Sequence, residues 1–388
     1  RLRIRWRMVR ENRKNAVDLM IKPDRYLALD VLRGMTIALM ILVNTPGSWR
    51  QVWAPLRHAG WHGCTPADLV FPFFLFVAGV SLFFSLQTSE GMSRKALCLK
   101  AFRRTALIFA LGLFLNTFPQ WLTDYSQLRI LGVLQRIALA YGLAAFLILA
   151  APGRWLAPIG ALILLVYWGL LWVGGGTDPY SLEQNAVVLL DRALLGEAHL
   201  YQGFGLPFDP EGLLSSMPAA VTVLIGYLAG GLTRRPQPEG VLIRLCVSGA
   251  ALTGAGYLWG VVFPINKPLW TSSYVLYTAG LALLVFALLI WIIDLRGVKR
   301  WTLIFSVFGV NPLFLFLLAG MWGRASNKLI FVTDAKGETV TFAAWLYHHL
   351  FVPLAGDSTG SFLYALAHVC LFWAVGFALY RRRIFIKV

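Results

Sequence analysis

Charged side chains are scarce in this sequence. They make up 14% of its 388 residues, whereas hydrophobic residues make up 58%, and the mean hydropathy is +0.67. A soluble domain carries about 25% charged residues. Because so little polar surface cannot cover a globule that faces water, the composition excludes a soluble protein and indicates an integral membrane protein.

Acidic residues are the scarcer of the charged types. The chain has 18 Asp and Glu residues against 35 Lys and Arg residues, which gives a net charge of +17. In a soluble protein this excess would suggest a nucleic-acid partner. Here the basic residues lie mostly between apolar runs, as topology signals and contacts with anionic lipid headgroups do. We therefore expect membrane lipids as partners and no nucleic acid.

Disulfide and metal-binding motifs are also missing. The four cysteines form no CxxC pair, and three of them lie inside apolar runs, where small buried hydrophobic residues are common. His58 and His62 are four residues apart, but Gly60 between them and Gly63 after them break a helix, and no Glu follows as in His-Glu-x-x-His. We expect no bound metal.

What the sequence does contain is a series of apolar runs long enough to cross a bilayer, which takes about 20 helical residues. We expect an all-α polytopic membrane protein with about ten transmembrane helices. The predicted spans are residues 29–45, 67–88, 99–118, 130–151, 154–174, 213–233, 241–263, 271–294, 301–322 and 360–380.

The basic residues are distributed unevenly between the two sides of these spans. On the side of the N-terminus lie 25 of the 35 Lys and Arg residues, eight lie on the other side, and Arg33 and Arg136 lie inside spans. This positive-inside bias predicts an even number of helices and places both termini in the cytoplasm. We expect a basic cytoplasmic segment over 1–26 and a single transmembrane domain over 27–388.

The segments on the far side of the membrane are the longer ones. Two of them, 175–212 and 323–359, are too long to be simple connectors, and long loops often carry function. Five of the six histidines also fall on this side. The pattern predicts that the polar chemistry gathers at the outer face.

Four charged residues in or beside the apolar runs are candidates for a site. Asp30 and Arg33 are three residues apart and can form an ion pair or a cytoplasmic anion site. An arginine inside a span is a functional candidate by default, and Arg136 is either such a site or the partner of Asp68. Asp68 follows Pro66 and fits a role in capping the second span.

Candidates for chemistry at the outer face are His58, Trp61 and Asn44. A histidine can act as a base near neutral pH because its pKa is ordinarily about 6.5. Trp61 can stack on a sugar ring or anchor the chain at the membrane interface. Asn44 ends the first span, where its amide can cap the helix or stabilise a developing oxyanion.

An ordered set of motifs resembles the heparan-α-glucosaminide N-acetyltransferase family, whose bacterial members are the NagX-like proteins. The motifs are RYLALDVLRG at 25–34 with Asn44, HAGWHGCTPADLVFP at 58–72, GVLQR at 132–136, HLYQ at 199–202, DPEG at 209–212, INK at 265–267, LWTSSYV at 269–275, GVNP at 309–312 and YRRRIF at 380–385.

The resemblance implies a transferase that takes acetyl groups from cytoplasmic acetyl-CoA and delivers them to the amine of a glucosamine-like amino sugar on the far side. It implies His58 as general base or acetyl carrier and Asn44 on the oxyanion side. Phosphates of the donor need cationic partners, for which the candidates are Arg33, Arg103, Arg104, Arg136 and Arg234. The expected acceptor-binding residues are Trp61, Asp68, Asp209, Glu211, Asn266 and Lys267.

Two other functions share the polytopic layout and the buried charges. One is a transporter of amino sugars, for which acetyl-CoA would be irrelevant. The other is a membrane acyltransferase that acts on a hydroxyl of a polysaccharide or lipid. For the acetyltransferase, the expected setting is a bacterial inner membrane, and the family resemblance makes a homodimer plausible.

Overall fold

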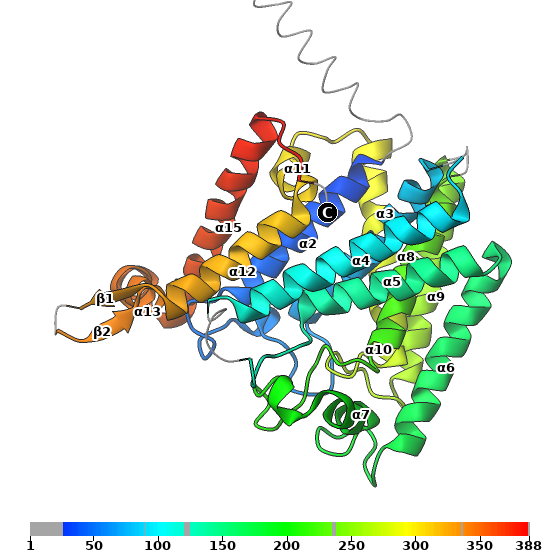
Figure 1. Cartoon of the computed structure of the whole chain (residues 1–388). Helices are drawn as coiled ribbons and strands as arrows, with labels where there is room; N and C mark the ends of the chain where they lie inside the picture. Colours follow the sequence, from blue (N-terminus) through cyan, green and yellow to red (C-terminus); the bar gives the residue numbers. More distant parts are fainter. Residues whose placement is uncertain (1–25, 90, 120–124, 235–237, 335–336, 387–388) are drawn as a thin grey trace, which may run out of the picture.

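The computed structural model describes residues 26–89, 91–119, 125–234, 238–334 and 337–386. The basic segment expected over 1–26 therefore lies outside the described residues, apart from Tyr26. The described chain is a bundle of long helices with a cap of loops at one end (Figure 1).

The long helices match the ten predicted spans in order. They are α2 (Leu27–Asn44), α3 (Val70–Gln87), α4 (Arg94–Thr117), α5 (Val133–Ala150), α6 (Leu156–Gly174), α8 (Ser216–Thr233), α9 (Pro238–Trp259), α10 (Ser272–Leu289), the pair α11 (Thr302–Val310) and α12 (Pro312–Lys328), and α15 (Asp357–Arg381).

Eight of these helices are long and apolar enough to span a membrane, and the α11–α12 pair would be a ninth. The tenth, α4, forms a helix of 24 residues, but its first turns carry five Lys and Arg residues. These charged residues lower the mean hydropathy of α4. A lysine or arginine at the centre of a membrane helix is costly. The all-α polytopic architecture is confirmed.

The span expected over 301–322 is not one straight helix. Its two halves, α11 and α12, are bent by 82° relative to each other. Asn311 leaves the helical conformation, with φ −126° and ψ 53°, and Pro312 begins α12. The Asn311 side chain binds the C-terminal segment, since Nδ2 donates to Ile384 O at 3.0 Å and Oδ1 accepts from Ile386 N at 2.7 Å.

Glycines allow the closest helix contacts. A Cβ at Gly34 on α2 would overlap Phe305 O on α11, and a Cβ at Gly309 on α11 would overlap Asp30 O on α2. The α3–α8 pair is similar, because a Cβ at Gly79 would overlap Val223 O. Small residues drive helix association in lipid, where the hydrophobic effect between helices is absent.

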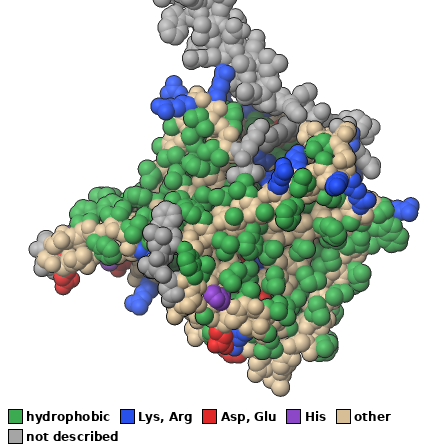
Figure 2. Space-filling model, in the orientation of Figure 1, with side chains coloured by type: hydrophobic (Ala, Val, Ile, Leu, Met, Phe, Trp, Pro, Cys, Tyr) green, Lys and Arg blue, Asp and Glu red, His purple; other side chains and the backbone are tan. Residues whose placement is uncertain are grey.

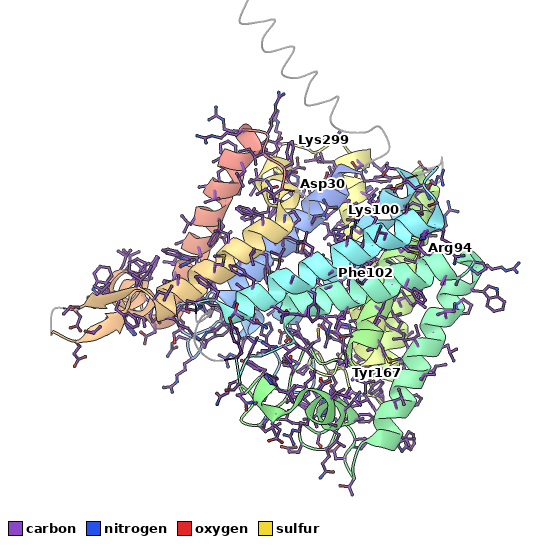
Figure 3. All side chains as sticks on the ribbon, viewed as in Figure 1. Asp30, Arg94, Lys100, Phe102, Tyr167 and Lys299 are labelled. Carbon is purple, nitrogen blue, oxygen red and sulfur yellow. The ribbon has the colours of Figure 1, made fainter. Side chains whose placement is uncertain are left out.

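Successive long helices run in alternating directions, so the bundle has two distinct ends. The basic face is the end at which α2 and α4 begin, and on it lie Asp30, Arg94, Lys100 and Lys299 (Figure 3). Lys and Arg side chains gather toward this end in the space-filling view, and hydrophobic side chains cover much of the flank (Figure 2).

The loop face is the opposite end, where α2 ends and α3 begins. It carries the segment between α6 and α8, which includes α7 (Ala186–Leu195). It also carries an antiparallel hairpin of β1 (Phe331–Thr333) and β2 (Thr339–Thr341), followed by α13 (Phe342–Leu346) and α14 (Val352–Ala355). The loop expected at 323–359 is thus partly helical and begins later, because α12 continues to Lys328.

Candidate active site

His58 and Asp68 form a close pair at the loop face. Asp68 lies in a 3-10 turn, Pro66–Leu69, directly before α3, and its carboxylate completes a capping box with Thr65. The predicted capping role is confirmed. Oδ1 lies 2.7 Å from His58 Nδ1, and Oδ2 accepts from Ala59 N and Thr65 N, each at 3.0 Å. Asp68 is 1% exposed, so these bonds hold the imidazole in a fixed place.

The His58 ring remains accessible. Its side chain is 37% exposed, and within the described part of the chain no hydrogen bond engages Nε2. Nδ1 points to a buried carboxylate, which favours the tautomer that carries hydrogen on Nδ1 and a lone pair on Nε2. This arrangement gives the chain an oriented imidazole that can accept a proton.

Lys267 completes a cluster of three groups, although it is 209 residues away from His58. Its Nζ lies 3.2 Å from Asp68 Oδ1 and 3.1 Å from His58 Nδ1. The neighbouring Asn266 is fully buried and donates to Trp61 O at 3.0 Å, and Gly63 N donates to Ile265 O at 2.7 Å. These bonds join the segment before α10 to the segment that carries His58.

Trp61 connects the same segment to the long loop between α6 and α8. Its Nε1 donates to Tyr180 O at 2.8 Å, and its ring packs edge-on against Phe204 and Phe208. Burial lowers the pKa of the nearby His62, against the opposing effect of Asp178. His62 is therefore neutral near pH 7, which suits its contact with the Asn266 amide at 3.3 Å.

The Cys64 thiol is the other potential nucleophile close to this cluster. Burial, together with the negative charge of Asp68, raises its pKa to about 12, although Lys267 acts in the opposite direction. Because the thiolate is the reactive form, Cys64 is inert near neutral pH. His58 is thus the more reactive of the two groups.

A cavity of about 460 Å³ lies between α2, α4, α5 and α12. Its described lining holds two arginines and two histidines but no Asp or Glu, and the polar side chains are Asn44, Thr45, Ser48, Asn116, Arg129, Gln135, Arg324, Ser326, Asn327, Tyr347, His348, Tyr364 and His368. No carboxylate of the described residues pairs with Arg324, which donates to Leu115 O and Asn116 Oδ1.

Asn44 is exposed to this cavity rather than capping α2. The residue that follows the helix is Thr45, and no described group forms a hydrogen bond with the Asn44 side chain. The amide is therefore available to a ligand. His58 is not among the residues that line the cavity, so the structure does not join the two expected catalytic residues in one lining.

Asp209 and Glu211 bind Arg129. Its Nε and Nη2 donate to Asp209 at 2.8 and 2.7 Å, and Nη2 also donates to Glu211 at 2.5 Å. Burial by itself lowers the pKa of Arg129, but the hydrogen bonds and charges of these carboxylates raise it above its usual range. The expected acceptor-binding carboxylates are thus already engaged, and Asp209 is fully buried.

Arg136 is fully enclosed in the half of α5 near the loop face. Its Nη2 donates to Pro210 O, Gly212 O and Ser215 Oγ at 3.1, 3.2 and 2.5 Å. The alternative that Arg136 pairs with Asp68 is wrong, because Nη2 is taken by the segment before α8, Nε and Nη1 have no hydrogen-bond partner among the described residues, and the Asp68 carboxylate is engaged by His58 and Lys267. With no exposed surface, it contacts neither solvent nor the basic face.

The other arginines expected to bind phosphate lie toward the basic face. Arg33 forms the expected ion pair with Asp30 at 3.0 Å and also donates to Ser81 Oγ at 2.7 Å. Arg103 and Arg234 are exposed, and Arg104 lies over the Tyr141 ring at 4.8 Å. Within the described ranges, no group of three or more His, Cys, Asp or Glu could hold a metal ion.

Sequence reasoning gave no site role to Arg129, Arg324 or His348, which line the cavity. The two arginines served only as topology signals, and His348 only as one of several histidines on the outer side. The DPEG motif was the available signal, since its two carboxylates require a cation near the loop face.

Comparisons with known proteins agree with the motifs. Residues 25–188 match the family described as "Heparan-alpha-glucosaminide N-acetyltransferase, catalytic". The chain is 30% identical over 346 residues to the heparan-alpha-glucosaminide N-acetyltransferase of Homo sapiens and 28% identical over 339 residues to that of Mus musculus. Each match covers 72% of this chain and 50% of the relative.

The chain thus spans about half the length of the curated relatives it matches. The matched region contains the five helices from α2 to α6 together with Asn44, His58 and Asp68. The resemblance inferred from the motifs is confirmed, since residues 25–188 match the catalytic region of the heparan-alpha-glucosaminide N-acetyltransferase family.

Proposed function

We propose that this protein is a membrane N-acetyltransferase that moves an acetyl group from acetyl-CoA to the amine of a glucosamine-like amino sugar. The observation that carries the proposal is the 2.7 Å contact between His58 Nδ1 and the buried Asp68 carboxylate. Enzymes that catalyse acyl transfer commonly use an imidazole base whose other ring nitrogen is held by a carboxylate.

In the proposed reaction, the nitrogen of the acceptor amine forms a bond to the acetyl carbon. His58 Nε2 takes a proton from that nitrogen, and the carbon–sulfur bond of the thioester breaks. The proton then passes to the departing thiolate, which gives free CoA and the N-acetyl sugar. The resemblance assigns to the Asn44 amide, which no described group engages, donation to the oxygen of the tetrahedral intermediate. This role requires the substrate to reach from the cavity to His58, which does not line it.

The cavity beside Asn44 suits the acceptor amine in its reactive form. An amine attacks a thioester only when it is neutral, and a protonated amine is stabilised by nearby carboxylates. The described lining has two arginines and no Asp or Glu. Such a lining favours the neutral amine over the ammonium ion and also accommodates acceptors that carry an anionic group.

We propose that the basic face is cytoplasmic and that the donor enters there. The positive-inside bias supports this orientation. Arg234 is exposed at this face where α8 ends, and Arg103 is exposed in the half of α4 that is nearer to it. Both suit the phosphates of CoA, and Arg33 and Arg104 lie in the same half of their helices. Arg136 is less suited, because it has no exposed surface. The setting that the bacterial resemblance favours is an inner membrane.

The test is a transfer assay on the protein purified in detergent, with radiolabelled acetyl-CoA and glucosamine. We expect labelled N-acetylglucosamine from the wild type and a loss of at least about a hundredfold in His58→Ala, since a positioned base contributes roughly 10²- to 10⁴-fold. The matched control is His349→Ala, which removes an exposed imidazole that stacks on Trp345.

The outcomes separate the rival functions. Equal product from wild type and His58→Ala would remove His58 from the essential step. If the wild type neither binds acetyl-CoA nor forms product, while it carries labelled glucosamine into vesicles, the protein is a transporter. Product on a hydroxyl, identified by mass spectrometry, would make it an O-acyltransferase.

A further inference from the structure

Lys267, Asp68 and His58 are in mutual contact. Asp68 Oδ1 lies 2.7 Å from His58 Nδ1 and 3.2 Å from Lys267 Nζ, and the two nitrogens are 3.1 Å apart. Nδ1 carries either one hydrogen or one lone pair, so it can donate to the carboxylate or accept from the ammonium, but not both. The shorter contact, to a buried carboxylate that accepts charge-assisted bonds, favours the first arrangement.

The charges at this site decide which state of His58 is stable. With His58 neutral, the Asp68 carboxylate and the Lys267 ammonium balance each other. Adding a proton to His58 would place a second cation 3.1 Å from Lys267 Nζ. A like charge at such a distance disfavours the charged form of a group, so Lys267 opposes protonation of the imidazole that Asp68 would otherwise encourage.

Other charged and titratable groups near His58 do not change this balance. Arg57 directs its guanidinium to Val52 O at 3.0 Å. His62 contacts Asn266, and Asp178 is its charged neighbour. Cys64 remains protonated at neutral pH. Asp68 and Lys267 are therefore the charged groups that contact the imidazole within the described residues.

Lys267 is held in place by its own segment of chain. Asn266 is fully buried between Trp61 O and Leu269 N, and Trp270 adopts a positive φ of 51°. A non-glycine residue in this region is uncommon and persists only where the surroundings hold it. The Lys267 side chain is only 21% exposed, so the ammonium is directed to the cluster rather than to solvent.

We propose that Lys267 is a positioning residue, whose ammonium balances the Asp68 carboxylate and opposes a second cation on the imidazole, and which thereby keeps His58 neutral with its Nε2 lone pair available as a base. The sequence had suggested that Lys267 binds the acceptor. The catalytic meaning of the new role rests on the proposed function, whereas its effect on His58 protonation can be measured without any substrate.

The direct test measures how fast diethylpyrocarbonate modifies His58 at different pH values, with peptide mass spectrometry to identify the site. The reagent attacks neutral imidazole, so the midpoint of the rate against pH reports protonation. Removal of a cation in contact, with partial solvent screening, moves the midpoint by about one pH unit. We expect it to rise by this amount in Lys267→Met and to stay at the wild-type value in Lys267→Arg.

Controls keep this result interpretable. The exposed His349 is an internal reference whose midpoint should not move, and Lys328→Met removes an exposed lysine of α12. If Lys267→Met elutes as an aggregate in detergent, Lys267→Gln keeps a hydrogen-bond donor without the charge and should show the same rise. An unchanged His58 midpoint in the folded neutral variant would overturn the proposal.

Measurements of transferase activity distinguish a failure of this proposal from a failure of the proposed function. In an active enzyme, the acid limb of kcat/KM against pH should move upward with the modification midpoint in Lys267→Met and return in Lys267→Arg. A wild type without transferase activity would reject the proposed function but leave the modification result intact. If the enzyme is active, but the acid limb and the modification midpoint are the same in wild type and Lys267→Met, the role of Lys267 is rejected and the proposed function is not.

Discussion

The Arg129 guanidinium lies side-on against the Asp209 carboxylate, with Nε to Oδ2 at 2.8 Å and Nη2 to Oδ1 at 2.7 Å. The carboxylate has no exposed surface, and the guanidinium stacks on the Tyr201 ring at 4.7 Å. This pair attaches the long loop between α6 and α8 to the segment before α5. Arg129 also lines the cavity that Asn44 lines.

The Asp209→Ala variant should lose stability. Breaking a buried ion pair leaves an uncompensated charge and costs about 3–5 kcal/mol, and the 26% exposure of Arg129 reduces this to about 2–3 kcal/mol. We expect a clearly lower midpoint of thermal unfolding in detergent. Glu211→Gln is the milder control, because it leaves the bidentate pair intact, and equal midpoints for all three proteins would contradict the prediction.

A second prediction concerns stability and pH. Burial raises the pKa of Asp191 to about 7, with a further rise from the charge of Asp209, against the hydrogen bond from Leu213 N and the charge of Arg136. Since the folded-state pKa exceeds the usual value of 3.8, the protonated form stabilises the fold. This contribution is complete below about pH 4, declines as the pH rises toward 7, and is absent above.

Asp191→Asn mimics the protonated carboxyl group at every pH. Midpoints of thermal unfolding measured from pH 5 to 8 should therefore fall for the wild type and change less for Asp191→Asn. At pH 8 the midpoint of the variant should be the higher of the two. Asp178→Asn, in the exposed part of the same loop, is the control and should follow the wild type. Parallel curves for wild type and Asp191→Asn would show that Asp191 is ionised throughout.

A third prediction concerns the Asn44 amide. If it stabilises the oxyanion, Asn44→Ala should lower kcat by about 10²- to 10³-fold, which is the usual effect of losing one such donor, while KM for acetyl-CoA changes little. Asn327→Ala is the matched control, because this amide lies in the same cavity but donates to Gly323 O at 2.7 Å. Similar kcat values for Asn44→Ala and Asn327→Ala would remove Asn44 from the chemistry.

A fourth prediction locates donor binding. Arg234→Glu replaces an exposed cation at the basic face, and Arg103→Glu replaces an exposed cation in the half of α4 nearer to that face. Each should raise KM for acetyl-CoA by about tenfold or more, since hydrogen bonds to charged groups contribute roughly 1.5–3 kcal/mol. The effect should shrink at high salt. Arg154→Glu is the control, because Arg154 is exposed at the same face between α5 and α6; a KM increase of equal size there would indicate only a general charge effect.

Local features of the molecule were predictable from the sequence. The span expected over 130–151 is observed as α5, Val133–Ala150, because hydropathy is a property of neighbouring residues. The Asp30–Arg33 pair and the capping by Asp68 were predictable for the same reason, since their partners are three residues apart. A proline after an asparagine at 311–312 was visible as well, but not the 82° bend that it accompanies.

Contacts between distant segments were not predictable in this way. Arg129 and Asp209 are 80 residues apart, and Lys267 and His58 are 209 apart. Both cations lie outside the predicted spans. Arg129 served only as a charge in the topology, and Lys267 was assigned to the acceptor rather than to His58. Arg136 was assigned to phosphate or to Asp68, yet its partners are three groups of the segment before α8.

The sequence by itself determined that the chain lies in a membrane, which stretches form its long helices, and which family its motifs resemble. This was possible because the ability to span a bilayer depends on the hydropathy of each local stretch of about 20 residues. The tertiary structure alone decided which loops meet, that Lys267 joins His58 and Asp68, and that Arg129 rather than a ligand occupies Asp209. Those contacts depend on how glycine-lined helices pack and where they deliver the ends of their loops, and hydropathy carries no information about either.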